Sequence, residues 1–552
     1  MRGWIRRQAY QIIRYLVDRR DRQSRVNTTF PTAQGHNYLV EPLFPDAAGA
    51  GFYTKFYAED AENPVAIDYK RYKTEIVAGT LGKAGQWHDV NVDGASALPY
   101  SITNANYFDA RGEHVLDVEF DGQTFEFRNL VSERFYYLPI PRAGRVRLRC
   151  DFDLVIGRPI PLAQKKKHRH KFVAVFFVDN FTQDILDMLD FERDLPNMAR
   201  FFGKGMSFDN CFSCSNWTLP SVASMVSGKS APEHRMVHPR KDVVVGDGYP
   251  LMSEIFQADD YLTFQACGNW RKSPRYGYAK GYDRTVYRNQ LSASDALDAL
   301  YSHVRAFPGR DTFAWVSLFD LHHSVALVPD IAVQLGVSLS AHDFFVEDAK
   351  TPLQLGQSPA RVERYIAELK RIDFHLGQFF AWLEAEYDED EYLVAMMADH
   401  GTTFVTEDSR KLARERCHIA FMLRGGGVPQ GRSSELLQNS DLLPLVAKYA
   451  GVDLEITGDG RVPECLGGPS ARPFVCTEIL YPGEPYSASL WDHEFNFQLE
   501  TQGRVNDRGE PDLRTYTMGL FRNHDPHTDL SKDFPERIRT FEQAVLARFV
   551  AA

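Results

Sequence analysis

The chain has 552 residues and a formal net charge of −11 at pH 7, with 44% hydrophobic and 25% charged residues. This composition is typical of a folded globular protein, and the length predicts several domains. The negative charge argues against nucleic-acid binding by bulk attraction, and no run of about eighteen apolar residues predicts a membrane-spanning helix.

The first predicted domain, residues 1–65, comprises a helix and an irregular lead-in. Charged residues such as Arg14 and Asp18 interrupt the apolar run that a secretory signal requires, so we expect no signal peptide and a cytoplasmic location. The segment from Trp4 to Val17 has the pattern of a short basic amphipathic helix. Such a helix either covers the protein surface or makes peripheral contact with a membrane.

Seven cysteines are scattered along the chain. An odd number of thiols without a predicted secretory signal favours reduced cysteines. Cys211 and Cys214 have the spacing of a zinc or redox pair, but no second cysteine pair or matched histidine pair completes a zinc site. We therefore expect both to be buried structural thiols.

Residues 66–160 predict a β-rich accessory domain that resembles a β-sandwich. Residues 115–120 largely alternate in polarity, and Asp121-Gly122 is typical of a hairpin turn into residues 124–128. Further strands are predicted at 135–140 and 145–152. Several short strands with little helix are typical of a sandwich. Such a domain binds a glycan, acts as a spacer or presents a partner surface, and the fold alone does not decide between these roles.

A compact basic segment at 159–171 follows, with three consecutive lysines from Lys165 to Lys167. One interpretation is a solvated connection between domains. The alternative is a patch that faces phosphates or a membrane.

The pattern changes at residue 172 to alternating strands and helices, which predicts a catalytic α/β domain over 172–467. Apolar strands are predicted at 172–178, 261–267, 312–319 and 392–397, and helices at 185–202, 292–306, 359–387 and 437–450. This alternation is typical of a mostly parallel central sheet covered by helices. Residues 468–552 predict a small C-terminal α+β subdomain, with strands at 474–479, 489–491, 495–499 and 516–521 and a helix at 534–549.

Chemically useful side chains follow three of these strands. Asp179 comes after the first strand, Asp320 after the third, and Asp399 and His400 after the last. Because ligands bind at the carboxyl ends of strands in such sheets, we expect the site to lie at these strand ends. The side chains after the first and last strands and the hydroxyl of Thr218 offer four ligands to one divalent cation, and the set suits zinc or manganese better than calcium. A threonine hydroxyl becomes a nucleophile only with help from a base or a metal, which such a site supplies.

The stretch from Trp217 to Ser221 resembles the nucleophile turn of the sulfatase and alkaline phosphatase superfamily. Other stretches are similar to this superfamily in the same order, at 195–208, 221–228, 320–323, 399–401, 441–451 and 519–526. The resemblance covers the chain from about residue 172 to 549. It implies an alkaline-phosphatase-like fold and an enzyme that acts on phosphate or sulfate esters.

Within this resemblance Thr218 takes the place of the nucleophile and of a fourth metal ligand. Asp179, Asp399 and His400 take the other metal positions. Asn180 stands where the family has a second aspartate, which disfavours calcium. The resemblance implies one divalent ion and leaves a second ion open.

The resemblance also implies residues around the transferred group. His322 takes the place of a histidine that contacts this group or protonates the leaving group, and the adjacent His323 is its rival. Lys411 matches a lysine that neutralises the bound anion, with an exposed loop lysine as the alternative interpretation, and His418 is a second candidate there. The substrate-binding side chains are expected to be Lys411, Arg271, Trp217 and Asn269.

The chain also departs from this family. Sulfatases have a cysteine or serine that matures to formylglycine, and an arginine four residues later, whereas this chain has Thr218 and Val222. A threonine cannot give the aldehyde hydrate. The family's lysine–tryptophan–histidine turn is Asn-Trp-Arg at 269–271. The threonine site is instead similar to that of phosphoethanolamine transferases and lipoteichoic acid synthases, which pass a phospho-alcohol group through a covalent threonine intermediate and carry membrane helices.

These observations predict a metal-dependent phosphotransferase or phosphodiesterase with a phosphothreonine intermediate. The expected donor is a phosphorylated small molecule, lipid or glycan, and the expected acceptor is a carbohydrate held by the β-rich domain. A sulfatase-like hydrolase of sulfate or phosphonate esters is one alternative, and an inactive binding protein on the same fold is another. Hydrolysis or transfer, and the oligomeric state, are left open.

Overall fold

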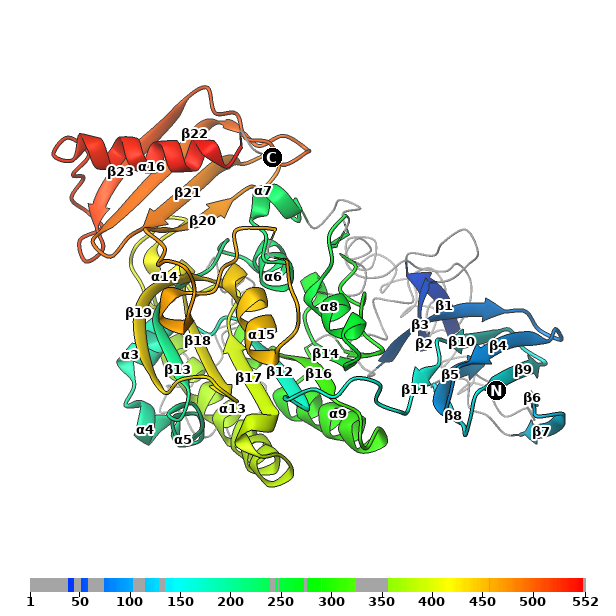
Figure 1. Ribbon diagram of the computed structural model, residues 1–552. Coiled ribbons are helices and arrows are strands. Elements are labelled where there is room, and N and C mark those ends of the chain that lie inside the picture. Colours follow the sequence, from blue (N-terminus) through cyan, green and yellow to red (C-terminus); the bar gives the residue numbers. More distant parts are fainter. Residues whose placement is uncertain are drawn as a thin grey trace, which may run out of the picture. The chain divides into compact units, whose positions relative to one another are not determined.

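The computed structural model describes residues 38–43, 51–57, 74–102, 115–128, 135–238, 244–246, 248–272, 276–288, 290–323, 356–455 and 457–549. The helix predicted from Trp4 to Val17 lies outside these residues. The chain divides into two compact units (Figure 1). One consists of Met1–Gln164, Ser273–Ala279 and Asp283–Asn289, and the other of Lys165–Lys272, Lys280–Tyr282 and Gln290–Ala552.

The first unit contains two sheets that share one apolar core. One sheet is antiparallel, in the order β4 (His88–Val92), β9 (Gly144–Cys150), β6 (Leu116–Phe120) and β7 (Gln123–Phe127). The other has the order β11 (Ile160–Pro161), β5 (Ser96–Ile102), β10 (Leu154–Gly157), β3 (Thr74–Gly82) and β15 (Arg284–Tyr287). β8 (Tyr136–Ile140) pairs with β5, and β1 (Tyr38–Leu43) pairs with β2 (Gly51–Tyr57), which pairs with β3. Side chains from both sheets, including Leu98 and Leu148, form the common core, as predicted for a sandwich.

Two details of this unit bear on the sequence predictions. The hairpin at Asp121-Gly122 is confirmed, since both residues have positive φ (54° and 72°), as a type I′ turn requires. β15 was not foreseen, because it comes from a distant part of the chain and is only four residues long. It pairs antiparallel with β3, and Arg284 on it binds the carboxylate of Glu75.

The second unit is built on a mixed sheet. Its strands run in the order β14 (Leu262–Cys267), β16 (Thr312–Leu318), β12 (Phe172–Val178), β17 (Tyr392–Met397), β18 (His418–Gly425), β13 (Met206–Phe212) and β19 (Gly431–Gln438). β14, β16, β12 and β17 are parallel, as predicted. The prediction of a mostly parallel sheet is confirmed, because β13 and β19 also run parallel to each other and β18 alone of these seven strands runs antiparallel to its neighbours.

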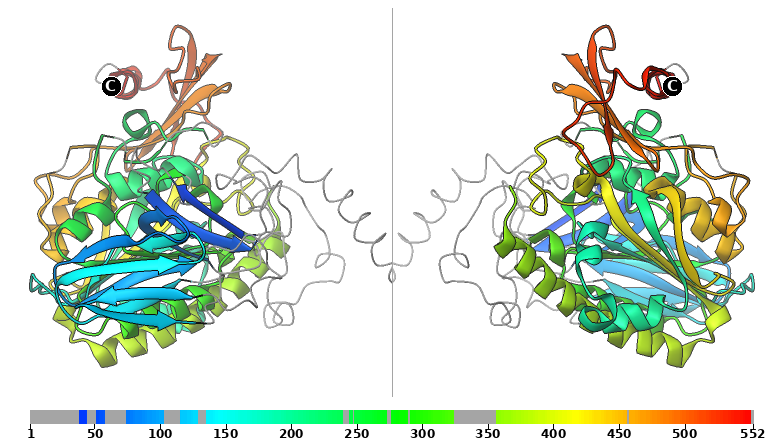
Figure 2. Two further views of the ribbon diagram at one scale, coloured as in Figure 1. Left: turned by 90° about the vertical axis from the view of Figure 1, so that its right-hand side faces the viewer. Right: turned by 90° about the vertical axis from the view of Figure 1, so that its left-hand side faces the viewer.

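Helices cover both faces of this sheet, which explains why all seven residues of β12 are buried. Phe172 and Phe176 contact Phe379 of α13 (Pro359–Glu386), with ring centroids 6.1 and 4.9 Å apart. Elsewhere α9 (Ala293–Ala306) contacts β14 and β16, α8 (Met252–Ala258) contacts β14 and α15 (Leu442–Ala450) contacts β17. Figure 2 shows the helices and the sheet from two further sides.

Two predicted helices differ from the observed ones. The helix predicted at 185–202 is three short helices, α3 (Gln183–Met188), α4 (Phe191–Asp194) and α5 (Pro196–Phe202). Pro196 disfavours helical backbone at Leu195, which has φ −132°, and therefore starts a new helix. The helix predicted at 437–450 begins only at Leu442, because the preceding residues complete β19 and a short 3₁₀-helix, η5 (Asn439–Asp441).

The C-terminal part of this unit has the four strands and the helix that the sequence predicts, and the strands form an antiparallel sheet with the helix packed on it (Figures 1 and 2). It comprises β20 (Val475–Ile479), β21 (Pro485–Trp491), β22 (Phe495–Arg504), β23 (Tyr516–Arg522) and α16 (Pro535–Ala547). β20 also binds the chain ahead of Thr218. The amide of Glu478 donates to the carbonyl of Cys214 at 3.0 Å, and Ser215 Oγ donates to the carbonyl of Glu478 at 2.7 Å.

The basic segment is partly fixed to the second unit. The amides of Lys165 and Lys166 donate to the carboxylate of Asp260, at 2.7 and 2.8 Å, and His168 Nδ1 lies 2.8 Å from Asp311. The interpretation as a simple solvated connection is therefore incomplete, because acidic side chains hold this part of it.

The predicted burial of Cys211 and Cys214 is confirmed, and the two thiols form no disulfide. Burial raises the pKa of the Cys214 thiol to about 11, which makes it unreactive near neutral pH. Among the described helices, none has the length and apolar character that crossing a bilayer requires.

Candidate active site

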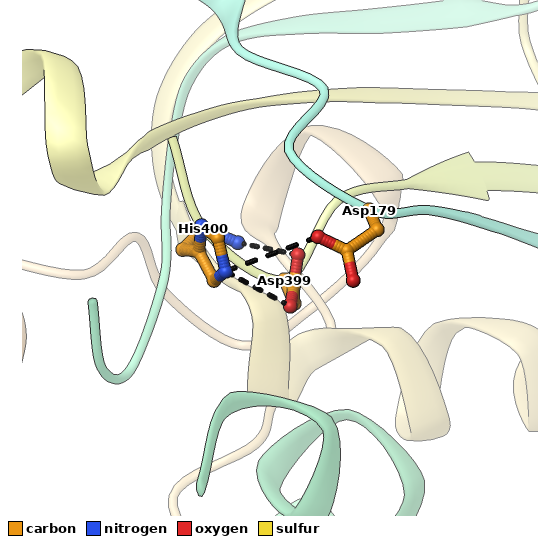
Figure 3. Close-up of side chains that lie close together, drawn as sticks. All are labelled: Asp179, Asp399 and His400. Atoms are coloured by element: carbon orange, nitrogen blue, oxygen red, sulfur yellow. Dashed lines mark hydrogen bonds and ion pairs between the residues drawn. The ribbon is translucent and has the colours of Figure 1, made fainter. Parts of the chain in front are cut away.

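Two adjacent parallel strands bring the predicted metal ligands together. β12 and β17 pair in register, with Phe177 opposite Met397, so their carboxyl ends coincide. Asp179 directly follows β12, and Asp399 and His400 follow β17 after one residue. Ligand atoms of the three side chains all lie within 4.8 Å of one another (Figure 3). The strand-end argument from the sequence therefore located this triad correctly.

The imidazole of His400 is oriented for metal binding. Its Nε2 lies 3.3 Å from Asp399 Oδ2 and 4.0 Å from Asp179 Oδ1 (Figure 3). Its Nδ1 lies 2.8 Å from the carbonyl of Gly401, which only accepts hydrogen bonds. Nδ1 therefore carries the proton, and the lone pair of Nε2 faces the carboxylates.

The carboxylates have the electrostatics of a cation site. Asp179 and Asp399 are fully buried, and Asp179 Oδ1 and Asp399 Oδ2 accept no hydrogen bond from the described residues. Burial, and then the neighbouring charge of Asp399, raise the pKa of Asp179 well above its usual range. Two ionised carboxylates buried side by side, without a positive charge between them, cost free energy. A divalent cation between them would remove this cost, so the donor set fits the metal that the sequence predicts.

Asn180 is held beside this triad in a conformation that few residues adopt. Its φ is 68°, in the left-handed region, where asparagine is better tolerated than most residues. Its backbone carbonyl accepts a hydrogen bond from Tyr365 Oη at 2.7 Å, and its backbone N–H donates to Asp399 Oδ1 at 3.4 Å. Its side-chain amide is buried and makes no hydrogen bond with the described residues, so its oxygen is a further candidate ligand.

Thr218 presents its hydroxyl to the triad from the start of a helix. It is the first residue of α6 (Thr218–Ser227), it is fully buried, and its Oγ1 lies 3.4 Å from His400 Nε2. The N-terminus of a helix carries partial positive charge and favours a bound anion. The structure thus joins the predicted nucleophile to the predicted metal ligands.

A single buried amide fixes Thr218 relative to the triad. Asn439 Oδ1 accepts from the amide of Cys214 at 3.0 Å, and its Nδ2 lies 3.3 Å from the carbonyl of Ser221 and 3.4 Å from that of Asp399. Sequence reasoning missed Asn439, because one asparagine after a strand carries no pattern that identifies such a role.

Three of the four predicted substrate-binding residues also converge here. Asn269 Nδ2 donates to Asp179 Oδ2 at 2.6 Å, and Asn269 Oδ1 accepts from the amide of Arg271 at 2.8 Å. Asn269 directly precedes the short 3₁₀-helix η2 (Trp270–Lys272), and Arg271 belongs to it. The guanidinium of Arg271 lies over the ring of Trp217, 5.6 Å from its centroid, and its charge lowers the pKa of Asp179 against the larger effect of burial.

Two of the remaining predicted residues, Lys411 and His322, have other described contacts. Lys411 is exposed, and its Nζ pairs with Glu500 at 3.3 Å, while its carbonyl accepts from Asn216. His322, in α10 (Asp320–His323), is half-buried and stacks on Phe319 with centroids 4.6 Å apart. The side chain of His323 lies outside the described residues. The roles of these three residues stay predictions.

Two candidates for a second ion, His418 and Asp320, are bound to other partners. His418 Nδ1 lies 3.2 Å from Asp184 and its Nε2 lies 2.6 Å from the carbonyl of Asp209, so both ring nitrogens are engaged. Asp320 binds Arg371 and accepts from the amide of Ala293 at 2.8 Å. Within the described ranges, the triad is the one cluster of three or more acidic, histidine or cysteine ligands.

The α/β fold and the triad at its strand ends agree with the family to which the sequence belongs, which is one of metal-dependent hydrolases. The chain belongs to the Sulfatase family, since the model of that family matches residues 171–452. No curated protein matches its sequence.

Solved structures show the same fold. The phosphonate monoester hydrolase of Silicibacter pomeroyi is 16% identical with a TM-score of 0.51, covering 69% of this chain and 95% of its own. The phosphonate monoester hydrolase of Agrobacterium radiobacter is 13% identical with a TM-score of 0.52, covering 69% and 95%. A putative sulfatase from Bacteroides thetaiotaomicron is 16% identical with a TM-score of 0.50, covering 70% and 92%. At these identities the likeness establishes the fold.

Proposed function

We propose that this protein is a phosphodiesterase or phosphotransferase in which Thr218 is the nucleophile and a phosphothreonine is the intermediate. One observation carries the proposal. Thr218 Oγ1 lies 3.4 Å from His400 Nε2, beside the unpartnered buried oxygens of Asp179 and Asp399. This places a hydroxyl where a cation held by the triad would activate it.

The residues support a two-step displacement. A bound divalent cation would lower the pKa of the hydroxyl and polarise a phosphoryl oxygen. Thr218 Oγ1 loses its proton to solvent and bonds to phosphorus, while the bond from phosphorus to the alcohol oxygen breaks. His322 or His323 gives a proton to the departing alcohol. Water, or a second alcohol in a transfer, then gives its proton to the same histidine and bonds to phosphorus, while the bond from phosphorus to Thr218 Oγ1 breaks and this oxygen regains a proton from solvent.

The positive groups around Thr218 suit a phosphoryl group. Thr218 is the first residue of α6, and the guanidinium of Arg271 lies over the ring of the preceding residue, Trp217. Fixed positive charge of this kind stabilises the oxygens of the transferring group. The donor in this proposal is a phosphorylated small molecule, lipid or glycan, the acceptor is a carbohydrate bound by the β-rich unit, and the location is cytoplasmic.

Sulfate hydrolysis is less favoured by the same residues. Val222 on α6, where sulfatases have an arginine, is an apolar side chain with no exposed surface. Thr218 cannot mature to formylglycine. Phosphonate monoester hydrolysis is the second candidate, because two proteins of the same fold have that activity in their names.

The relative rates of three aryl esters test the proposal. We expect the purified protein with added manganese or zinc to cleave bis(4-nitrophenyl) phosphate and 4-nitrophenyl phenylphosphonate much faster than 4-nitrophenyl sulfate. The physical reason is that a threonine alkoxide and a divalent cation favour attack on phosphorus. A kcat/KM that is highest for the sulfate ester would contradict the proposal, and no turnover of any ester would favour an inactive binding protein.

A further inference from the structure

An aromatic cluster extends from the nucleophile turn to the C-terminal sheet. Trp217 directly precedes Thr218, and its ring centroid lies 5.7 Å from that of Tyr481, at an interplanar angle of 57°. Tyr481 lies between β20 and β21, and its ring centroid is 5.0 Å from that of His238. Tyr481 and His238 are both half-buried, so each keeps some surface for a ligand.

Trp217 connects this cluster to the charged part of the site. The guanidinium of Arg271 lies 5.6 Å from the centroid of the Trp217 ring, and the backbone N–H of Arg271 donates to Asn269, which itself donates to Asp179. Trp217 therefore contacts both a positive side chain next to the triad and an aromatic ring of the C-terminal sheet. The contacts lead outward from the triad through Asn269, Arg271 and Trp217 to Tyr481.

Hydrogen bonds to backbone carbonyls hold the segments of Trp217 and Tyr481 together. Three residues before Tyr481, the amide of Glu478 donates to the carbonyl of Cys214, three residues before Trp217. Ser215 Oγ donates to the carbonyl of the same Glu478, and Ser221 Oγ on α6 donates to the carbonyl of Ser215. Such preorganised rings bind a ligand without first being ordered.

We infer that Tyr481, with Trp217 and His238, forms a subsite for a ring-bearing group that stays on phosphorus during the reaction. The inference rests on the proposed function of Thr218. In-line displacement places the leaving oxygen opposite the attacking Thr218 Oγ1. A substituent that stays on phosphorus is then on the side of Thr218, where its chain neighbour Trp217 lies, and the faces of aromatic side chains bind aryl or sugar rings. The substrate class is a phosphodiester with a retained aryl or glycosyl group.

Two esters with the same leaving group test the subsite. Bis(4-nitrophenyl) phosphate retains an aryl ring, whereas methyl 4-nitrophenyl phosphate retains a methyl group. In Tyr481→Leu we expect kcat/KM for the bis-aryl ester to fall about 10-fold, mainly through KM, because the variant loses one aromatic contact with the retained ring, and 10-fold corresponds to about 1.4 kcal/mol. The methyl ester should change by less than about 2-fold. Tyr481→Phe should retain both rates.

Further variants keep the test decisive. His238→Ala is expected to show the same selective loss at smaller size, and serves if Tyr481→Leu does not fold. Tyr449→Ala, at a half-buried tyrosine on α15, is the matched control and should change neither rate. An equal loss on both esters, or no loss on either, would overturn the subsite. Full activity of a Thr218→Val variant would instead overturn the proposed function, so the two failures are distinguishable.

Discussion

Replacing Thr218 with valine is expected to lower kcat/KM for bis(4-nitrophenyl) phosphate by about 10⁴-fold or more. Removal of a catalytic nucleophile in a comparable covalent mechanism costs on this order. Valine has the β-branched shape of threonine but lacks the hydroxyl, so at the fully buried start of α6 the substitution removes that one group. The loss would therefore report the missing hydroxyl, measured as initial rates with saturating metal.

Thr218→Ser is the matched control, because it retains a hydroxyl at the same position. We expect it to keep most of the activity and to bind the same amount of metal as the wild-type protein. Thermal unfolding of both variants shows whether the fold is intact. Turnover by Thr218→Val at close to the wild-type rate would exclude a covalent mechanism and leave only attack by water.

Replacing either carboxylate of the triad with its amide is expected to remove the metal and most of the activity. A cation that polarises a phosphoryl oxygen supplies several kcal/mol of transition-state stabilisation, so we expect kcat/KM to fall about 10³-fold in Asp179→Asn and Asp399→Asn. Elemental analysis of the purified variants measures the loss of metal. Asp184→Asn, which changes a carboxylate bound to His418 outside the triad, is the control.

The same carboxylates predict a pH-dependent effect of metal on stability. Burial and Asp399 raise the pKa of Asp179 well above its usual 3.8, so the folded metal-free protein binds a proton that the unfolded chain releases. Its free energy of unfolding therefore falls as the pH rises from about 4 towards the raised pKa. Because metal binds the deprotonated form, added metal should raise Tm more at about pH 8 than at about pH 5. An equal rise at both values, or normal metal content in Asp179→Asn, would contradict the assignment.

The sequence predicted the part of the site that depends on strands with a strong pattern. β12 and β17 are fully buried apolar runs, so their ends, and with them Asp179 and Asp399, could be located from the sequence. The resemblance of the turn after β13 to a nucleophile turn then supplied Thr218. In space, pairing of the two strands in register brings these residues together.

Other elements lacked such patterns. β19 is exposed over its first half and buried only at its end, so its polar residues do not alternate as a strand with one buried face would. Asn439 and Tyr481 act through contacts with residues more than two hundred positions away in the chain. No local periodicity reports contacts of this kind. Lys411 matches the family's anion-binding lysine by its distance from Asp399 in the sequence. In the structure its ammonium group pairs with Glu500, and its role stays a prediction.

The most direct measurement is the mass of the peptide that contains Thr218 after an acid quench during turnover of bis(4-nitrophenyl) phosphate. A covalent mechanism predicts that this peptide gains the mass of one 4-nitrophenyl phosphoryl group, that fragmentation places the group on Thr218, and that Thr218→Val shows no such gain. An unmodified peptide during a product burst, or the group on another residue, would contradict a threonine nucleophile at this metal site.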